Sequence, residues 1–143
     1  MSNEKTYSSD LKEYKFNDST ILGSFRKTVD VTASDVEAVI VNCMEGGSNY
    51  WLGLDNTTDI WKKKPQGIPL STWTTQMLLE GETINFYDIE DEANTFTLTL
   101  SKLIEGFKLN AEHRPFDCDL ENGDATTSDC ILQYGIFGEV VYG

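Results

Sequence analysis

Residues 83–100, TINFYDIEDEANTFTLTL, contain the pattern that decides the fold class. Apolar and polar residues alternate over 83–89 and again over 95–100, which is typical of strands with one buried face. The acidic stretch between them, IEDEAN, is polar enough for a solvated turn. The segment is therefore predicted to form a hairpin. Ile84, Phe86 and Asp88 are candidates for one face of its first strand, and Phe96, Leu98 and Leu100 share one face of its second strand.

Helical periodicity lies on both sides of this hairpin. An apolar stripe at i, i+3, i+4, i+7 and i+8 runs through Val36, Val39, Ile40, Cys43 and Met44. Ser34 with Glu37 is a capping-box pattern for this helix, and Thr32 is a competing cap. Gly46 and Gly47 are expected to end it in the left-handed conformation. Further helices are predicted over 71–79, from a Ser101 cap to before Pro115, and from an Asp124 cap to Gly138.

The remaining segments predict short strands at 24–31, at 50–55 and at the edge position 139–142, with a loop over 56–70. Together with the hairpin, they predict a single α+β domain over 21–143. Its mostly antiparallel sheet is packed on one side by three to four helices. Residues 1–20 are polar and weakly periodic, and they are predicted to be a flexible leader.

The composition limits the kind of protein. The chain has 143 residues, with 11 Lys+Arg against 24 Asp+Glu, so its formal net charge is −13. A hydrophobic content of 39% is too high for a disordered acidic tail. No apolar run approaches the roughly 18 residues of a membrane span, and the first residues do not form a signal segment. We therefore expect no membrane association and a location in the cytoplasm of the host cell.

Residues that carry catalysis are scarce. Cys43, Cys118 and Cys130 are odd in number and fit no disulfide or zinc spacing, and Cys43 and Cys130 fall on apolar helical stripes. The one histidine, His113, stands at a predicted helix end, and no phosphate-binding loop or metal triad is present. We expect a protein that is not an enzyme and that uses no cofactor or metal.

The charge predicts the kind of partner. A protein at −13 repels nucleic-acid phosphates, so direct nucleic-acid binding is disfavoured. The same carboxylates can occupy a basic groove of another protein. The candidate acidic surface consists of Asp88, Glu90, Asp91, Glu92, Asp117, Asp119 and Glu121. A calcium loop from Asp117 is a poorer interpretation, because Asn122 and Ser128 stand where an EF-hand needs glycine and glutamate.

Two motifs, MEGGSNYW at 44–51 and SDCILQYGIFGEVVYG at 128–143, together with FTLTLSKLIEGFKL at 96–109, resemble a family of small uncharacterised bacteriophage and prophage proteins. That family has an E-G-G-x-x-Y-W pattern and a C-terminal D-x-I-x-Q-Y-x-x-F-G-E-x-V-Y-G pattern. The resemblance covers roughly residues 25–143 and departs over 56–70, at Cys130 and before Phe25. It implies a phage context and favours a protein that binds and blocks host machinery.

Both motifs mix charged, amide and aromatic side chains, which could converge on one ligand pocket. Its candidate residues are Glu45, Tyr50, Trp51, Asp129 and Gln133. The competing interpretation is that these side chains only satisfy buried groups and fill the core.

The leading hypothesis is an anti-CRISPR-like, acidic nucleic-acid mimic that inhibits a host antiviral defence protein, such as a nucleic-acid-guided nuclease. The alternatives are a sponge for a nucleotide signal and a virion structural or assembly protein. The sequence leaves the oligomeric state open.

Overall fold

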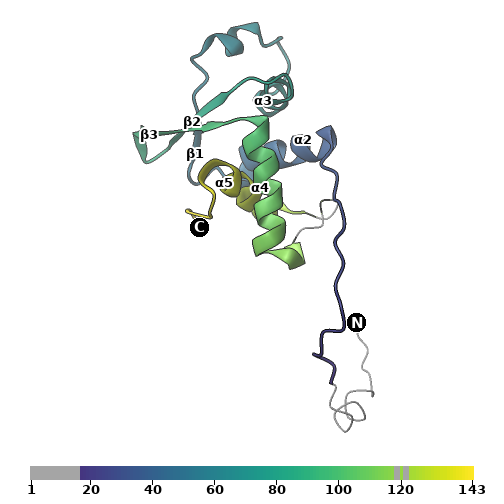
Figure 1. The fold of residues 1–143 in the computed structure, drawn as a ribbon. Helices are drawn as coiled ribbons and strands as arrows, with labels where there is room; N and C mark the ends of the chain where they lie inside the picture. Colours follow the sequence, from purple (N-terminus) through teal and green to yellow (C-terminus); the bar gives the residue numbers. More distant parts are fainter. Residues whose placement is uncertain (1–16, 118–119, 121–122) are drawn as a thin grey trace. The chain divides into compact units, whose positions relative to one another are not determined.

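A three-stranded antiparallel sheet with the order β1-β2-β3 forms one layer of the fold (Figure 1). Its strands are β1 (Leu52–Leu54), β2 (Ile84–Asp88) and β3 (Asp91–Leu98). Ile84 pairs with Leu98 and Phe86 with Phe96, so the predicted hairpin is confirmed. Leu100, predicted on the second strand, instead begins helix α4 (Leu100–His113). Between Tyr87 and Asp88 the register shifts, and β3 begins at Asp91 within the predicted turn.

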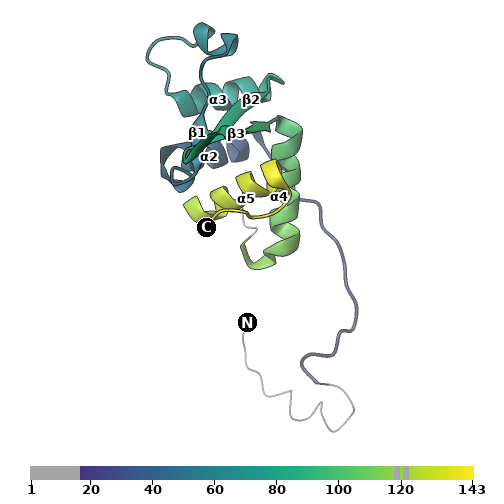
Figure 2. The same ribbon diagram turned by 90° about the vertical axis from the view of Figure 1, so that its left-hand side faces the viewer.

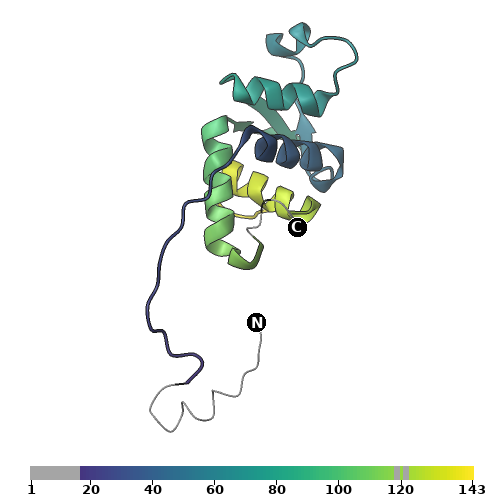
Figure 3. The same ribbon diagram turned by 90° about the vertical axis from the view of Figure 1, so that its right-hand side faces the viewer.

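Among the residues that the structure describes, the α-helices are α2 (Ala33–Asn42), α3 (Leu70–Leu79), α4 (Leu100–His113) and α5 (Ala125–Phe137). A π-helical turn, Cys43–Gly47, extends α2, and 3-10 turns lie at Asp59–Lys63 and Pro115–Asp117. Figure 3 shows α3, α2 and α5 one beneath another, with α4 crossing at their side. The α+β class predicted from the sequence is confirmed.

These elements come from a computed structural model that describes residues 17–117, 120 and 123–143. The chain divides into two units, residues 1–30 and residues 31–143, and every element above lies in the second unit. Among the described residues, no helix has both the length and the apolar character needed to cross a membrane.

The core lies between the inner face of the sheet and the helices. Ile84, Phe86 and Leu98 of the hairpin are buried there, together with Ile40 of α2 and Leu103 of α4. The alternate residues of the sheet face away from the helices and carry polar side chains. One-sided burial of this kind explains why the hairpin alternates so clearly.

Glycines allow α4 and α5 to cross in backbone contact. A Cβ at Gly106 would lie 2.3 Å from the carbonyl oxygen of Ile131, and one at Gly135 would lie 2.8 Å from that of Lys102. Any side chain at Gly106 would push the two helices apart. Helix α5, which carries Asp129 and Gln133 of the candidate site, is therefore fixed against α4.

Two predicted strands are wrong. Residues 24–31 form no strand, and Phe25 is 94% exposed, because alternation alone does not supply a neighbouring strand. Residues 139–142 form no strand either. The side-chain amide oxygen of Gln133 instead accepts hydrogen bonds from the backbone N–H groups of Val141 and Tyr142, at 2.8 and 2.7 Å.

Three predicted helix ends also differ. Thr32, not Ser34, caps α2 through a reciprocal capping box with Asp35, and Thr99, not Ser101, caps α4. The left-handed end expected at Gly46–Gly47 is replaced by the π-helical turn. Gly47 is needed there for space, since a Cβ would lie 2.9 Å from the carbonyl oxygen of Ala125. The Asp124 cap and the left-handed Gly138 end of α5 are as predicted.

Candidate functional site

The centre of the site is the carboxylate of Asp129, which is 6% exposed in the second turn of α5. Its Oδ1 accepts hydrogen bonds from the Ser48 hydroxyl at 2.6 Å and from Trp51 Nε1 at 2.9 Å. Its Oδ2 accepts from the Tyr50 hydroxyl at 2.5 Å and from Gln133 Nε2 at 3.0 Å. We call these five residues the Asp129 cluster.

All four donors of the Asp129 cluster are neutral. Burying a carboxylate is costly unless its oxygens are hydrogen-bonded, and four donors match the roughly four lone-pair sites of an ionised carboxylate. The cluster is therefore saturated, and its first effect is to hold the turn at 48–51 against α5.

Gln133 extends the cluster to the C-terminal segment. Besides binding Asp129, its Nε2 donates to the carbonyl oxygen of Tyr142 at 3.2 Å, while its Oε1 accepts the two backbone N–H groups described above. Figure 2 shows the yellow C-terminal segment returning alongside α5. One buried amide therefore takes the place of a neighbouring strand.

Aromatic packing completes the inner wall. The rings of Trp51 and Tyr142 are stacked at 4.7 Å with an interplanar angle of 9°, and Phe137 and Phe96 lie 5.7 and 6.0 Å from Trp51. The Tyr142 hydroxyl donates to Asp88 Oδ2 at 2.7 Å. This bond joins the C-terminal segment to the hairpin.

Three side chains of the site, Tyr50, Tyr142 and Asp88, have shifted pKa values. Burial, and then the hydrogen bond to Asp129, raises the pKa of Tyr50 to about 12. Burial and the bond to Asp88 raise the pKa of Tyr142 to about 12. That hydrogen bond from Tyr142, and then the N–H of Glu90, lower the pKa of Asp88 below its ordinary value. Asp88 is thus an anion and both tyrosines are neutral.

Outside the cluster lies a hollow of about 850 Å³. Tyr50, Asp129 and Tyr142 line it together with Glu90 of the hairpin turn. Residues from the two predicted sets, the ligand pocket and the acidic surface, thus meet at one hollow. Its described lining contains no Lys or Arg, which disfavours a phosphate-bearing ligand and weakens the nucleotide-sponge hypothesis.

The other predicted pocket residues take different positions. Trp51 and Gln133 are almost completely buried and support the wall of the hollow from behind. Glu45 does not join the Asp129 cluster, because its Oε2 accepts a hydrogen bond from the Ser71 hydroxyl at 2.7 Å, at the start of α3.

The predicted acidic surface is formed in part. Glu90, Asp91 and Glu92 are exposed at the hairpin turn, next to Asp88. Asp117 ends the 3-10 turn after α4, while Asp119 and Glu121 lie outside the described residues. Across the described part of the chain, the two ion pairs are Lys62–Asp59 and Lys108–Glu105, and neither involves the hairpin turn.

Cys43 and His113 are both packed against other parts of the fold. Burial raises the pKa of the Cys43 thiol to about 12, so the thiolate that nucleophilic attack needs does not form near neutral pH. His113 is the last residue of α4, as predicted, and stacks on Tyr134 at 5.5 Å. Among the described residues, no group of three or more His, Cys, Asp or Glu side chains is placed to hold a metal ion.

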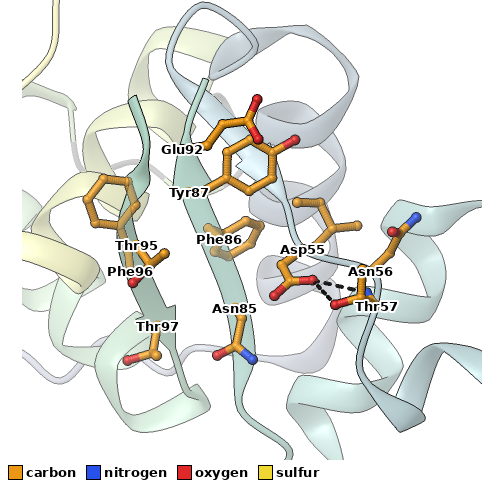
Figure 4. A pocket seen from close by; sticks show the side chains of 11 residues that line it. Asp55, Asn56, Thr57, Asn85, Phe86, Tyr87, Glu92, Thr95, Phe96 and Thr97 are labelled. Carbon is orange, nitrogen blue, oxygen red and sulfur yellow. Dashed lines mark hydrogen bonds between the residues drawn. The ribbon is translucent and has the colours of Figure 1, made fainter. Parts of the chain in front are cut away.

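A second hollow, which the sequence analysis missed, lies on the outer face of the sheet (Figure 4). Its polar side chains include Asn85, Tyr87, Thr95 and Thr97, the alternate residues of the hairpin. The signal was present in the sequence, since these residues are the polar half of the alternation. Only the apolar half was assigned a role.

Comparison with protein families, with curated proteins and with solved structures found no match to this chain. Function is therefore inferred from the residues and their geometry.

Proposed function

We propose that this chain is a non-enzymatic phage protein that binds a host protein through its acidic surface and inhibits it. The partner that we propose is a nucleic-acid-binding protein of antiviral defence, such as a nucleic-acid-guided nuclease. The phage context rests on the resemblance of the two motifs. The observation that supports the binding mode is the exposed, unpaired group of carboxylates at the hairpin turn.

The carboxylates of the turn are exposed and form no ion pair within the described chain. They belong to Glu90, Asp91 and Glu92, which project from the turn. Asp88 stays ionised because Tyr142 and a backbone N–H bind its carboxylate. A partner groove lined with Lys and Arg would attract this surface over a distance and speed association.

The shape around the turn favours a protein partner over a small one. The Tyr142–Asp88 hydrogen bond holds the hairpin turn to the C-terminal segment, and Gln133 holds that segment to α5. The carboxylates therefore project from a part of the structure that is fixed in place. A fixed frame lowers the conformational entropy lost when two proteins associate. The hollow beside Glu90 adds a concave surface next to the acidic turn.

The test is capture of host proteins on the tagged full chain from a nuclease-treated lysate. Two variants are compared, each of which removes three carboxylates. The hairpin variant is Glu90→Gln/Asp91→Asn/Glu92→Gln, and the matched control is Glu37→Gln/Glu82→Gln/Glu112→Gln, at exposed positions on other elements.

A basic nucleic-acid-binding protein should be captured in a stoichiometric amount by the native chain and by the control variant. The hairpin variant should lose it, and added nucleic acid should displace it. Equal capture by both variants, or capture of no protein, contradicts the proposal.

A further inference from the structure

The outer face of the sheet carries a hollow of about 480 Å³, within the roughly 300–1,000 Å³ range of small-molecule sites. Figure 4 shows Asn85 and Tyr87 along its floor on β2, with Thr95 and Thr97 of β3 on one side and the Asp55–Thr57 segment on the other. Glu92 lies next to Tyr87 at one end. This hollow is separate from the Asp129 cluster.

An aromatic ring is held in place at that end. A Cβ added at Gly53 would lie 2.4 to 2.9 Å from three ring carbons of Tyr87, so the ring occupies the space that a side chain at Gly53 would fill. Gly53 pairs with Tyr87 across β1 and β2. The glycine therefore positions Tyr87 as a fixed apolar surface within a polar hollow.

Most polar groups of the hollow have hydrogen-bonding capacity left over. Within the described chain, the side chains of Asn56, Asn85 and Thr95 have no hydrogen-bond partner. Two lining residues already have partners. The Oδ1 of Asp55 accepts from the N–H and the hydroxyl of Thr57, at 3.0 and 2.6 Å, and the hydroxyl of Thr97 accepts from Lys102 Nζ at 2.9 Å. The free groups are amides and a hydroxyl, which both donate and accept.

These groups select the chemistry of a ligand. Asp55 and Glu92 bring two negative charges, and the ammonium of Lys102, bound to Thr97 at the edge, offsets only one of them, so an anion is disfavoured. A ligand that only donates would leave the amide N–H groups unpaired, which is costly. The lining is best matched by a neutral molecule with several hydroxyls and one apolar face that covers Tyr87. We propose that this hollow binds a neutral saccharide.

The proposal is tested by titrating the ¹⁵N-labelled full chain with four probes: methyl glucoside, methyl galactoside, N-acetylglucosamine and maltose. Amide signals of Asn85, Tyr87 and Thr95 should shift in a saturable way, at millimolar concentrations, for at least one probe. Signals of α5 should stay unchanged. Adenosine serves as a neutral aromatic comparison.

Variants connect any shift to the hollow. Asn85→Ala and Tyr87→Leu should each weaken binding of the responding sugar about tenfold or more, since each removes a hydrogen-bonding side chain or the ring. Asn49→Ala, at an exposed position outside the hollow, should leave the affinity unchanged. Unchanged signals elsewhere in each variant verify that it is folded.

The proposal is overturned if none of the four sugars shifts these signals, or if Asn85→Ala and Tyr87→Leu bind as tightly as Asn49→Ala. It is also overturned if adenosine shifts the same signals and the sugars do not.

Discussion

Replacing Asp129 by alanine should destabilise the fold strongly, because the carboxylate is the shared acceptor of the Asp129 cluster. The substitution removes the acceptor of four hydrogen bonds. Three of the donors, on Ser48, Trp51 and Gln133, are at most 1% exposed and have little access to water. A buried donor left without a partner costs about 1–3 kcal/mol, while removal of the carboxylate also relieves the cost of burying it. We expect a loss of about 3–5 kcal/mol, a large part of the roughly 5–15 kcal/mol stability of a typical domain.

Two further variants grade the effect. Asp129→Asn keeps one oxygen for Ser48 and Trp51 but places an amide N–H beside the donors of Tyr50 and Gln133. It should cost about 1–2 kcal/mol, because Gln133 keeps the carbonyl of Tyr142 as an alternative acceptor. Tyr50→Phe removes a donor that is 51% exposed, so at most about 1 kcal/mol is expected.

The assay is unfolding in urea, monitored by tryptophan fluorescence. It gives the free energy of unfolding of each variant and the slope of that free energy against urea concentration. The order of stability loss should be Asp129→Ala, then Asp129→Asn, then Tyr50→Phe. An Asp129→Ala variant no less stable than Tyr50→Phe, at an unchanged slope, would refute the role given to this carboxylate.

Four other outcomes are expected. Gly106→Ala should lower the stability by about 1–3 kcal/mol, seen as a lower Tm, because the α4–α5 crossing has no room for a methyl group. The control is Gly23→Ala, which has open space around it and should leave Tm unchanged. Tm should fall as pH rises from about 10 to about 12, because tyrosines ionise in the unfolded chain while the fold keeps Tyr50 and Tyr142 protonated. Tyr142→Phe should reduce this fall of Tm, and an equal fall in that variant would contradict the role given to Tyr142. Tm should also fall as pH drops below the ordinary carboxyl range, because the pKa of Asp88 is lowered in the fold. Cys43 should resist alkylation in the native state, which mass spectrometry of its peptide can verify.

Periodicity predicted the parts of the fold that have one buried face. The hairpin and the stripe of Val36, Val39 and Ile40 follow directly from it, because burial on one face enforces a regular spacing. It failed over 24–31 and 139–142, where the spacing is similar. A strand also needs a neighbour for its backbone groups, and a single sequence does not show which segment supplies one.

Part of the candidate site could be predicted from the types and spacing of its residues. Asp129 and Gln133 stand four residues apart on one helix face, so their convergence could be foreseen. The role of Ser48 was missed because a serine after two glycines has no pattern that separates a buried donor from a turn residue. Glu45 was misplaced because a π-helical turn changes the direction of the side chains that follow α2.

The most direct test of the proposed function is the association rate with the captured host protein, measured at increasing salt concentration. If carboxylates of the hairpin turn steer binding, the rate constant should fall steeply with salt for the native chain and for the Glu37/Glu82/Glu112 control variant. The hairpin variant should associate more slowly at low salt and depend less on salt. An association rate that is independent of salt, or equal for the hairpin and control variants, would contradict an acidic surface that occupies a basic groove.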